Sequence, residues 1–499
     1  MTRSAGILLP VSSLPSPYGV GVFGKEARAF LDKAAAMKFH KWQVLPFTMV
    51  DSHNSPYASV SAFAGNYLFI DPRGLAEEGL LTEQEVKEAE YHGSPYTADY
   101  AFAKESRLSL LRLAFSRLTG KKAQEVKNFA KSQPWLPPFA LLMAIQKEQD
   151  GKPWWEWPEE LAKYELALEH RREYEAETVF WEFVQYEFFR QWAEIKAYAE
   201  EKEIEVIGDM PIYVSRDSSD VWANRELFLL DPDTYEPEKV AGVPPDYFSE
   251  DGQLWGNPLY DWEKMAKDGF AWWMSRLKAA MDFYHIVRID HFRALASFWA
   301  VPVTAKTAKE GSWMKGPGMA FFEAVKKAFP EPPKIIAEDL GVFGEDVVEL
   351  LERSGLPGMR VVQFGFEPGA DSSHLPHNYP HNCVAYVGTH DNNTLLGWLW
   401  EASPEERAFA LRYCGFSGDD WSQGGYNSPS CRAIIEAVWR SAADTAIISI
   451  QDMCGFGSDT RMNVPGSDAN HWRFRIGKNN LEELDADYFA EINALFSRG

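Results

Sequence analysis

The stretch Ile286-Val287-Arg288-Ile289-Asp290-His291 ends a short apolar, β-branched run with a carboxylate. Two later stretches repeat this pattern: Lys334-Ile335-Ile336-Ala337-Glu338-Asp339 and Val384-Ala385-Tyr386-Val387-Gly388-Thr389-His390-Asp391. A buried parallel strand reads as such an apolar run, and an acid at its carboxyl end lies where parallel α/β enzymes carry out chemistry. The three stretches therefore predict a parallel sheet with acids at one end, an arrangement suited to glycosyl chemistry with two carboxylates.

Five further stretches fit a buried strand, and amphipathic helical segments separate most of them. The eight predicted strands cover residues 5–10, 42–46, 205–210, 285–290, 334–338, 360–364, 384–389 and 445–450. Strands that alternate with helices predict a parallel sheet, and eight such strands close a barrel. The predicted fold is therefore an α/β protein, a (β/α)₈ TIM barrel with helical and loop insertions and no β-sandwich after the last barrel helix.

Two long intervals interrupt the alternation. Residues 73–175 are dense in Glu, Lys, Leu and Trp at helical spacing, and because a structureless loop of that length is implausible, they predict an inserted, mainly helical subdomain. The interval of about residues 215–281 is rich in Gly, Pro and aromatic residues, which predicts an ordered lid. The barrel is then expected in two parts, residues 1–72 with the first two strands and residues 176–499 with the rest.

The composition of the 499-residue chain restricts its partners. A net charge of -23 without a basic cluster would repel nucleic acid and anionic membrane surfaces, so a neutral substrate is expected. The 19 Trp and 20 Tyr suit sugar binding, although core packing is their commoner role. No apolar run approaches the roughly 20 residues of a membrane span. The four cysteines show no CxxC or metal-ligand spacing, which predicts a reducing, cytoplasmic location. No cofactor is expected.

Successive side chains of a strand point to opposite faces of the sheet, and this predicts which acids face the barrel interior. Arg288 and Asp290 are two residues apart and should share a face, where the Arg would keep the Asp ionised as a nucleophile requires; the alternative is a structural ion pair at a strand end. Glu338 follows an apolar run, and burial would raise its pKa toward that of a proton donor. Asp339 competes for this role, but only one of these neighbours can face the barrel mouth. Glu338 could instead begin the next helix as a cap.

The polar stretch after the seventh strand supplies two more candidates. His390 and Asp391 could grip neighbouring sugar hydroxyls, and Asp209 adds a fourth carboxylate at the same end of the barrel. A metal site could use these acids together with His291 and His390. No HxxxH or HxH pair supports zinc, however, so no metal is expected.

Several of these segments resemble the 4-α-glucanotransferases, also called amylomaltases or disproportionating enzymes, which are distantly related to the α-amylase clan. The matching motifs are Asp209-Met210-Pro211-Ile212-Tyr213-Val214, Arg288-Ile289-Asp290-His291-Phe292-Arg293, Ala337-Glu338-Asp339-Leu340-Gly341, Gly388-Thr389-His390-Asp391-Asn392 and Arg461-Met462-Asn463-Val464-Pro465-Gly466. The resemblance continues in residues 55–57, 61–66 and 242–258, and it spans most of the chain in the same order.

The resemblance implies roles for individual residues. Asp290 would be the nucleophile, Glu338 the general acid/base and Asp391 the stabiliser of the transition state. The donor sugar would be held by Arg288, His390 and Asp209, with Tyr57 as its stacking platform. Other substrate-binding residues would be Trp255, Phe364, Asn463 and, in the lid on the acceptor side, Tyr247 and Phe248.

The implied activity is transfer of α-1,4-glucan segments from a donor maltodextrin to the 4-hydroxyl of an acceptor glucan or glucose by a retaining double displacement, with cyclisation of long glucans open to the same chemistry. A retaining mechanism places the two catalytic carboxyls about 5–5.5 Å apart. The partners would be maltooligosaccharides and α-1,4-glucans, and the protein would be a monomer or homodimer. Two alternatives stay open: a plain α-glucan hydrolase, and a non-catalytic glucan-binding protein that keeps the fold.

Overall fold

The eight predicted strands form one parallel sheet in the computed structural model, which describes residues 3–245, 249–341, 344–467 and 471–499. The order of the strands across the sheet is β10-β11-β12-β1-β2-β3-β6-β9. Their bounds are β1 Ser4–Leu8, β2 Lys41–Gln43, β3 Glu205–Met210, β6 Ile286–Ile289, β9 Ile335–Ala337, β10 Gly358–Val361, β11 Cys383–Tyr386 and β12 Thr445–Ser449. The two outer strands meet where the N–H of Ala337 donates to the carbonyl oxygen of Pro357 at 2.9 Å, so the sheet closes into the predicted (β/α)₈ barrel.

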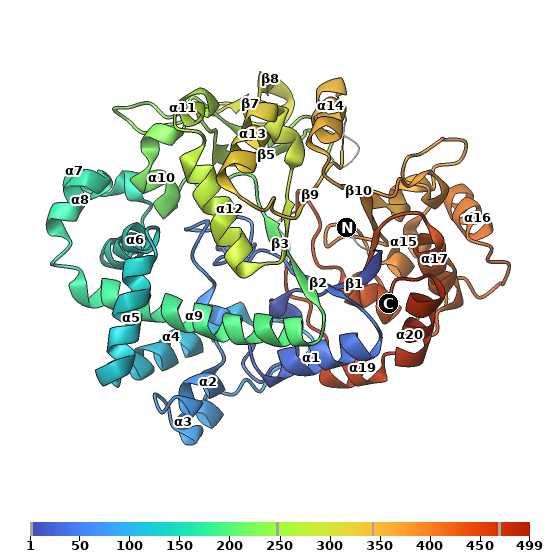
Figure 1. The fold of residues 1–499 in the computed structure, drawn as a ribbon, viewed down its shortest axis with the longest axis horizontal. Coiled ribbons are helices and arrows are strands. Elements are labelled where there is room, and N and C mark those ends of the chain that lie inside the picture. Colours follow the sequence, from blue (N-terminus) through green and yellow to red (C-terminus); the bar gives the residue numbers. More distant parts are fainter. Residues whose placement is uncertain (1–2, 246–248, 342–343, 468–470) are drawn as a thin grey trace.

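The two ends of the described chain meet at the start of the barrel. Ser4 of β1 pairs with Thr445 of β12, and the N–H of Ala5 donates to the carbonyl oxygen of Arg498 at 3.0 Å. The buried Arg498 side chain donates in turn to the carbonyl oxygens of Trp439, at 2.9 Å, and Ser4, at 3.3 Å. The N and C labels accordingly lie close together in Figure 1.

Alternate residues of each barrel strand pack into two separate clusters. One small cluster fills the barrel interior and contains Ile207, Ile286, Ile336, Met359 and Tyr386. The residues between them along each strand, such as Val287 and Ile289, belong instead to the large core between sheet and helices. Arg288 and Asp290 lie two and four residues after Ile286. This alternation with a period of two confirms that their side chains face the inside of the barrel.

Helices connect most of the strands. The helices between consecutive barrel strands include α1 (Lys25–Ala36), α9 (Glu175–Glu201), α12 (Ala271–Phe283), α13 (Met319–Ala328) and α14 (Glu345–Ser354), followed before β12 by α15 (Leu395–Glu401), α16 (Pro404–Tyr413) and α17 (Pro429–Arg440). The link from β10 to β11 departs from this alternation, since residues 362–382 contain only the 3₁₀ turns η7 (Val362–Gly365) and η8 (Pro376–Asn378). After β12 come α18 (Ile450–Met453), α19 (Lys478–Glu483) and α20 (Ala486–Leu495).

Residues 73–175 are mainly helical and lie to one side of the barrel, at the left of Figure 1. Their helices are α2 (Pro72–Glu77), α3 (Glu83–Glu88), α4 (Tyr100–Ser116), α5 (Gly120–Ser132), α6 (Leu136–Glu148), α7 (Glu159–Ala162) and α8 (Tyr164–His170). Local signals set their starts: Asp71 caps α2 ahead of Pro72, and Thr82 and Glu85 form a capping box at α3. Helices α5 and α6 pack against the long α9, which joins this region to the barrel.

A second, four-stranded antiparallel sheet lies at the top of Figure 1, in the strand order β5-β4-β7-β8. Strands β4 (Lys239–Val243) and β5 (Gln253–Pro258) come from the predicted lid interval, together with α10 (Ser219–Ala223) and α11 (Trp262–Lys267). The other two strands, β7 (Ser297–Pro302) and β8 (Ser312–Lys315), follow β6 and are absent from the sequence prediction. Helix α12, which begins inside residues 215–281 and ends at Phe283, packs on β3 and β6 and so belongs to the barrel wall.

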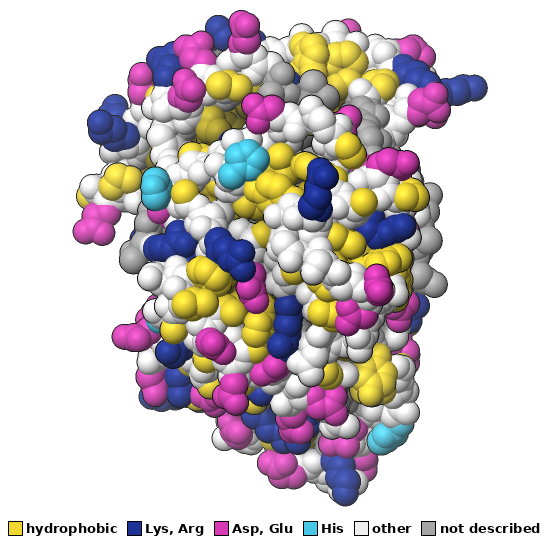
Figure 2. Space-filling view, turned by 90° about the vertical axis from the view of Figure 1, so that its right-hand side faces the viewer, with side chains coloured by type: hydrophobic (Ala, Val, Ile, Leu, Met, Phe, Trp, Pro, Cys, Tyr) yellow, Lys and Arg dark blue, Asp and Glu magenta, His cyan; other side chains and the backbone are white. Residues whose placement is uncertain are grey.

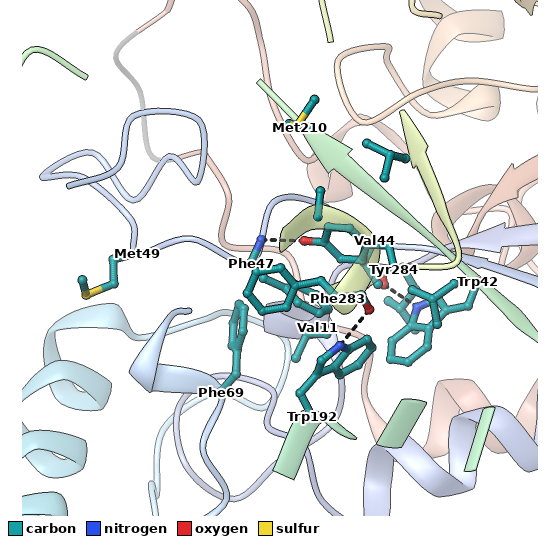
Figure 3. Close-up of a cluster of buried hydrophobic side chains, with 14 of the residues drawn as sticks. Val11, Trp42, Val44, Phe47, Met49, Phe69, Trp192, Met210, Phe283 and Tyr284 are labelled. Atoms are coloured by element: carbon teal, nitrogen blue, oxygen red, sulfur yellow. Dashed lines mark hydrogen bonds between the residues drawn. The ribbon is translucent and has the colours of Figure 1, made fainter. Parts of the chain in front are cut away.

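An aromatic cluster in the core between the sheet and its helices joins β2, α9 and α12, and Figure 3 shows its side chains. Phe47 meets Trp192 of α9 edge-on, with 4.6 Å between ring centroids. The indole N–H of Trp192 donates to the carbonyl oxygen of Phe283 at 2.9 Å, and the N–H of Phe47 donates to the hydroxyl of Tyr284 at 3.2 Å. Because these rings are buried and their polar atoms are paired, the cluster gives the loop after β2 a rigid base.

No helix of the described ranges is long and apolar enough to cross a membrane. Figure 2 shows acidic and basic side chains interspersed over the face that lies at the right of Figure 1.

Candidate active site

The predicted acids lie at the carboxyl ends of barrel strands. Asp209 is the penultimate residue of β3, Asp290 follows β6 and Glu338 follows β9. The main-chain pairing continues past the strand ends, since the N–H of Asp290 donates to Met210 and the N–H of Glu338 donates to Ile289, both at 3.0 Å. Asp209, Asp290 and Glu338 are thus held on a rigid sheet edge.

Arg288 connects two of these acids. Its Nη1 lies 2.6 and 2.7 Å from the two carboxylate oxygens of Asp209 and 3.0 Å from Oδ1 of Asp290. Burial lowers the pKa of Arg288, but the two carboxylates raise it well above its ordinary value, so the guanidinium stays charged. The pair predicted from Arg288 and Asp290 is therefore part of a three-residue network at the barrel mouth.

Glu338 and Asp339 face different surroundings, as their adjacency requires. Oε2 of Glu338 accepts the N–H of His291 and Oε1 accepts the N–H of Leu340, each at 2.7 Å. Asp339 instead accepts the N–H of Met359 at 2.5 Å and pairs with Arg360 at 2.9 Å. Glu338 is therefore the acid beside Asp290, and Asp339 ties β9 to β10.

The pKa values of the Asp290 and Glu338 carboxyls are both raised above their ordinary values. Burial raises the pKa of Asp290 well above its ordinary value, Arg288 lowers it, and Asp209 and Glu338 raise it. Burial likewise raises the pKa of Glu338, against the effects of Arg288 and of the two backbone N–H donors. This crowding of acids favours retention of a proton in the site.

Asp391 approaches from the loop after β11. Its Oδ1 accepts the amide N–H of Asn463 at 2.6 Å, and its carbonyl oxygen accepts Nη2 of Arg461 at 2.6 Å. Nε2 of His390 lies 3.3 Å from Oδ2 of Asp391. With 43% of its side chain exposed, Asp391 is oriented by its neighbours yet open to a ligand.

Tyr57 and His390 form a stacked pair, with 5.4 Å between ring centroids and 17° between planes. The Tyr57 hydroxyl donates to Oδ2 of Asp209 at 2.7 Å and lies 2.9 Å from Nε2 of His390. Because the hydroxyl proton goes to Asp209, Nε2 of His390 carries the proton that it donates to Tyr57. Burial lowers the pKa of His390, against the effect of Asp391. Trp472 packs against both rings.

Several of these side chains border a cavity of about 570 Å³. Among the predicted residues, its lining includes Tyr57, Trp255, Asp290, His390, Asp391 and Asn463. Trp255 is 37% exposed and meets the ring of His291 edge-on, with 4.8 Å between centroids. Loops after β2, β3 and β12 and the edge strand β5 thus surround one cleft over the barrel mouth.

The lining of this cavity does not include the predicted residues Asp209, Arg288, Glu338 and Phe364. Phe364 is half-buried, packs against the interior barrel cluster and meets His374 edge-on at 5.6 Å. Tyr247 and Phe248 lie outside the described residues. The described part of the chain contains no group of three His, Cys, Asp or Glu residues arranged to hold a metal ion.

Sequence reasoning did not name Trp472 or Trp155, and it gave Arg461 and the backbone of His291 no role in the site. Trp472 and Arg461 come from the loop after β12, and Trp155 comes from the helical region. The backbone N–H of His291 binds Glu338. The loop that contains Arg461 and Trp472 supplied one predicted site residue, Asn463, and that prediction came from the resemblance to the family. Loop residues and backbone donors leave no periodic signal in a single sequence.

Comparisons with known proteins agree with this geometry. The model of glycoside hydrolase family 77, the 4-alpha-glucanotransferases, matches residues 9–480. A 4-alpha-glucanotransferase from Thermus thermophilus is 42% identical over 99% of this chain and 98% of its own, and one from Aquifex aeolicus is 43% identical over 95% of each. The structure of an amylomaltase from Streptococcus agalactiae in complex with acarbose superposes with a TM-score of 0.94 at 36% identity, covering 100% of both chains. This chain, with Asp290, Glu338 and Asp391 at the carboxyl ends of its (β/α)₈ barrel strands, therefore belongs to the 4-alpha-glucanotransferase family.

Proposed function

We propose that this member of the family transfers α-1,4-glucan segments between maltodextrins by a retaining double displacement, with Asp290 as nucleophile, Glu338 as general acid/base and Asp391 as transition-state stabiliser. One observation carries the proposal: Asp290 and Asp391 line one cleft, Glu338 follows the strand next to that of Asp290, and each acid has a separate set of partners. Separate environments allow carboxyls of one site to hold different protonation states.

In the first step, a carboxylate oxygen of Asp290 attacks the anomeric carbon of the donor sugar. The glycosidic C–O bond breaks, Glu338 gives its proton to the departing 4-oxygen, and a glucosyl ester of Asp290 remains. We assign the charge to Asp290 because the guanidinium of Arg288 touches it at 3.0 Å. The proton of the pair then belongs to Glu338, a residue that is only 8% exposed.

In the second step, the 4-hydroxyl of an acceptor sugar attacks the same carbon. Glu338, now ionised, takes the hydroxyl proton, and the ester bond breaks to restore the Asp290 carboxylate. Two inversions retain the α configuration. The exposed carboxylate of Asp391 would face the positive charge that develops on the sugar ring, with Asn463 and His390 fixing its direction.

The donor sugar would rest on Tyr57, whose ring lies beside His390 and whose hydroxyl is fixed by Asp209. Trp255 at the edge of the cleft would cover the acceptor side, together with Tyr247 and Phe248. Exclusion of water by such a cover favours a sugar hydroxyl over water as the attacking group. Phe364, packed under the barrel mouth, would support the donor site from below.

Incubation with maltotriose tests the proposal. Transfer predicts glucose together with maltopentaose and longer oligomers at an unchanged total number of glycosidic bonds, because each broken bond is replaced. A hydrolase would give only shorter sugars and a rising number of reducing ends. Binding of maltotriose without any product would support a non-catalytic glucan-binding protein.

The same proposal includes the cellular setting. The cysteines Cys383, Cys414, Cys431 and Cys454 are all buried and unpaired, which is typical of a reducing compartment such as the cytoplasm. A neutral glucan suits a chain of net charge -23. We propose that the protein acts there as a monomer or homodimer, and size-exclusion chromatography with light scattering distinguishes the two.

A further inference from the structure

The helical region reaches the cleft through Trp155, next to the catalytic barrel. Trp155 belongs to the 3₁₀ turn η3 (Trp154–Glu156) and lines the same cavity as Tyr57, Trp255 and Asp290. It is partly exposed, whereas both Trp154 and Trp157 are buried. A large apolar ring is thus left open to a cleft that the reaction uses.

Trp154, not Trp155, anchors this turn to the barrel. The indole N–H of Trp154 donates to the carbonyl oxygen of Arg216 at 2.7 Å, and its main-chain N–H donates to Asp217 at 3.3 Å. Gln146 of α6 donates to the other oxygen of Asp217 at 3.2 Å. The attachment of the helical region to the loop after β3 therefore does not require the ring of Trp155.

The ring of Trp155 is nevertheless held in one position. The guanidinium of Arg216 lies 4.0 Å from its centroid, and Trp154 meets it edge-on with 5.5 Å between centroids. Arg216 is fixed in turn by Glu236 at 3.0 Å and by the carbonyl oxygen of Tyr235 at 2.9 Å. An aromatic ring immobilised before binding loses little conformational entropy when a ligand packs on it.

We propose that Trp155 is a remote binding platform for the α-glucan chain, so that it selects for long chains without a part in the chemistry. Glucose has a C–H face that packs on an indole, and the ring N–H or a neighbouring polar group can bind its hydroxyls. Arg216 follows the last residue of β3 by six positions and lies outside the contacts of the three acids. Trp155 would therefore meet a sugar other than the one whose bond reacts.

This inference takes the identity of the ligand from the proposed function. Its first test therefore measures binding of the glucan alone, with no turnover needed. Wild type, Trp155→Ala and Trp155→Phe are run in native gels with and without soluble starch. Trp421→Ala is the matched control, because Trp421 is also half-buried beneath an arginine, with Arg407 4.2 Å from its centroid, but it does not line the cleft. We expect Trp155→Ala to bind starch about two- to tenfold more weakly, with Trp155→Phe and Trp421→Ala near wild type.

The second test compares kcat/KM for maltotriose and for long amylose. Loss of a remote platform should lower the value for amylose about two- to tenfold and leave that for maltotriose within twofold. Starch retention equal to that of Trp421→Ala would overturn the inference, and so would an equal loss on both substrates. If wild type made no transfer products, the proposed function would fail, while the gel result would still decide whether Trp155 binds glucan. Equal melting temperatures of the variants verify that each is folded.

Discussion

The main-chain N–H of His291 donates to Oε2 of Glu338 at 2.7 Å, which joins the residue after the proposed nucleophile to the proposed acid. His291 has a φ of 52°, a left-handed conformation that costs a non-glycine residue about 1–2 kcal/mol. Burial raises the pKa of Glu338, while this N–H and that of Leu340 lower it. A group that gives a proton in one step and takes it back in the next needs such opposed influences.

Replacement of Asp290 by Asn should lower kcat at least about a thousandfold, because the amide keeps the shape of the side chain but cannot form the ester. Maltotriose turnover measures the loss, and thermal unfolding measures the fold, which we expect to be kept. Asp419→Asn, at an exposed acid outside the cleft, is the control. A loss of only a few-fold would rule out Asp290 as the nucleophile.

Replacement of Glu338 by Gln should stall turnover of maltodextrins but spare the first step on a glucosyl fluoride, whose leaving group needs no proton. Equal losses on both donors would show that Glu338 is not the acid. The variant should also be less stable by about 1–3 kcal/mol, because the new amide N–H group must oppose either the N–H of His291 or that of Leu340. Denaturant unfolding measures this cost.

Replacement of Tyr57 by Phe should lower kcat/KM about ten- to a hundredfold, since Asp209 loses a donor at 2.7 Å while the stacked ring remains. Initial rates over a range of maltotriose concentrations check this. Tyr386→Phe is matched to it, because the Tyr386 hydroxyl donates to Gln43 at 2.8 Å inside the barrel. That control should lose stability and keep KM. If both variants behaved alike, Tyr57 would be a packing residue.

Asp220 should make stability depend on pH. Burial raises its pKa to about 6, and the N–H of Ala62, which donates to Oδ2 at 2.7 Å, lowers it. In the unfolded chain the carboxyl has a pKa of about 4. Because its pKa in the folded protein is higher, the group stabilises the fold below about pH 4, and this stabilisation is lost as pH rises through about 6. The difference in free energy of unfolding between Asp220→Asn and wild type should therefore shift in favour of the variant by up to roughly 3 kcal/mol from pH 4 to pH 7. Unfolding curves at both pH values test it, and a constant difference would contradict it.

The barrel strands were predictable because buried parallel strands appear in a sequence as apolar runs. The direction of their acidic side chains was predictable because side chains along a strand alternate with a period of two. The same rule separated Glu338 from Asp339. Strands β7 and β8 were not predictable: several of their residues, such as Trp299 and Trp313, are partly exposed, so no buried run marks them. The contact between Asp391 and Asn463 joins two loops 72 residues apart, and a single sequence holds no signal for such pairing.

The pairing of Ser4 with Thr445 has a consequence for synthesis of the protein. Strand β1 leaves the ribosome first among the barrel strands, and its neighbour β12 follows only after about 440 further residues, or roughly 20–90 s at the usual rates of elongation. During that time one edge of β1 lacks its partner strand, and unpaired apolar edges aggregate readily. The free edge of β1 is therefore a point at which aggregation competes with folding until β12 has been made.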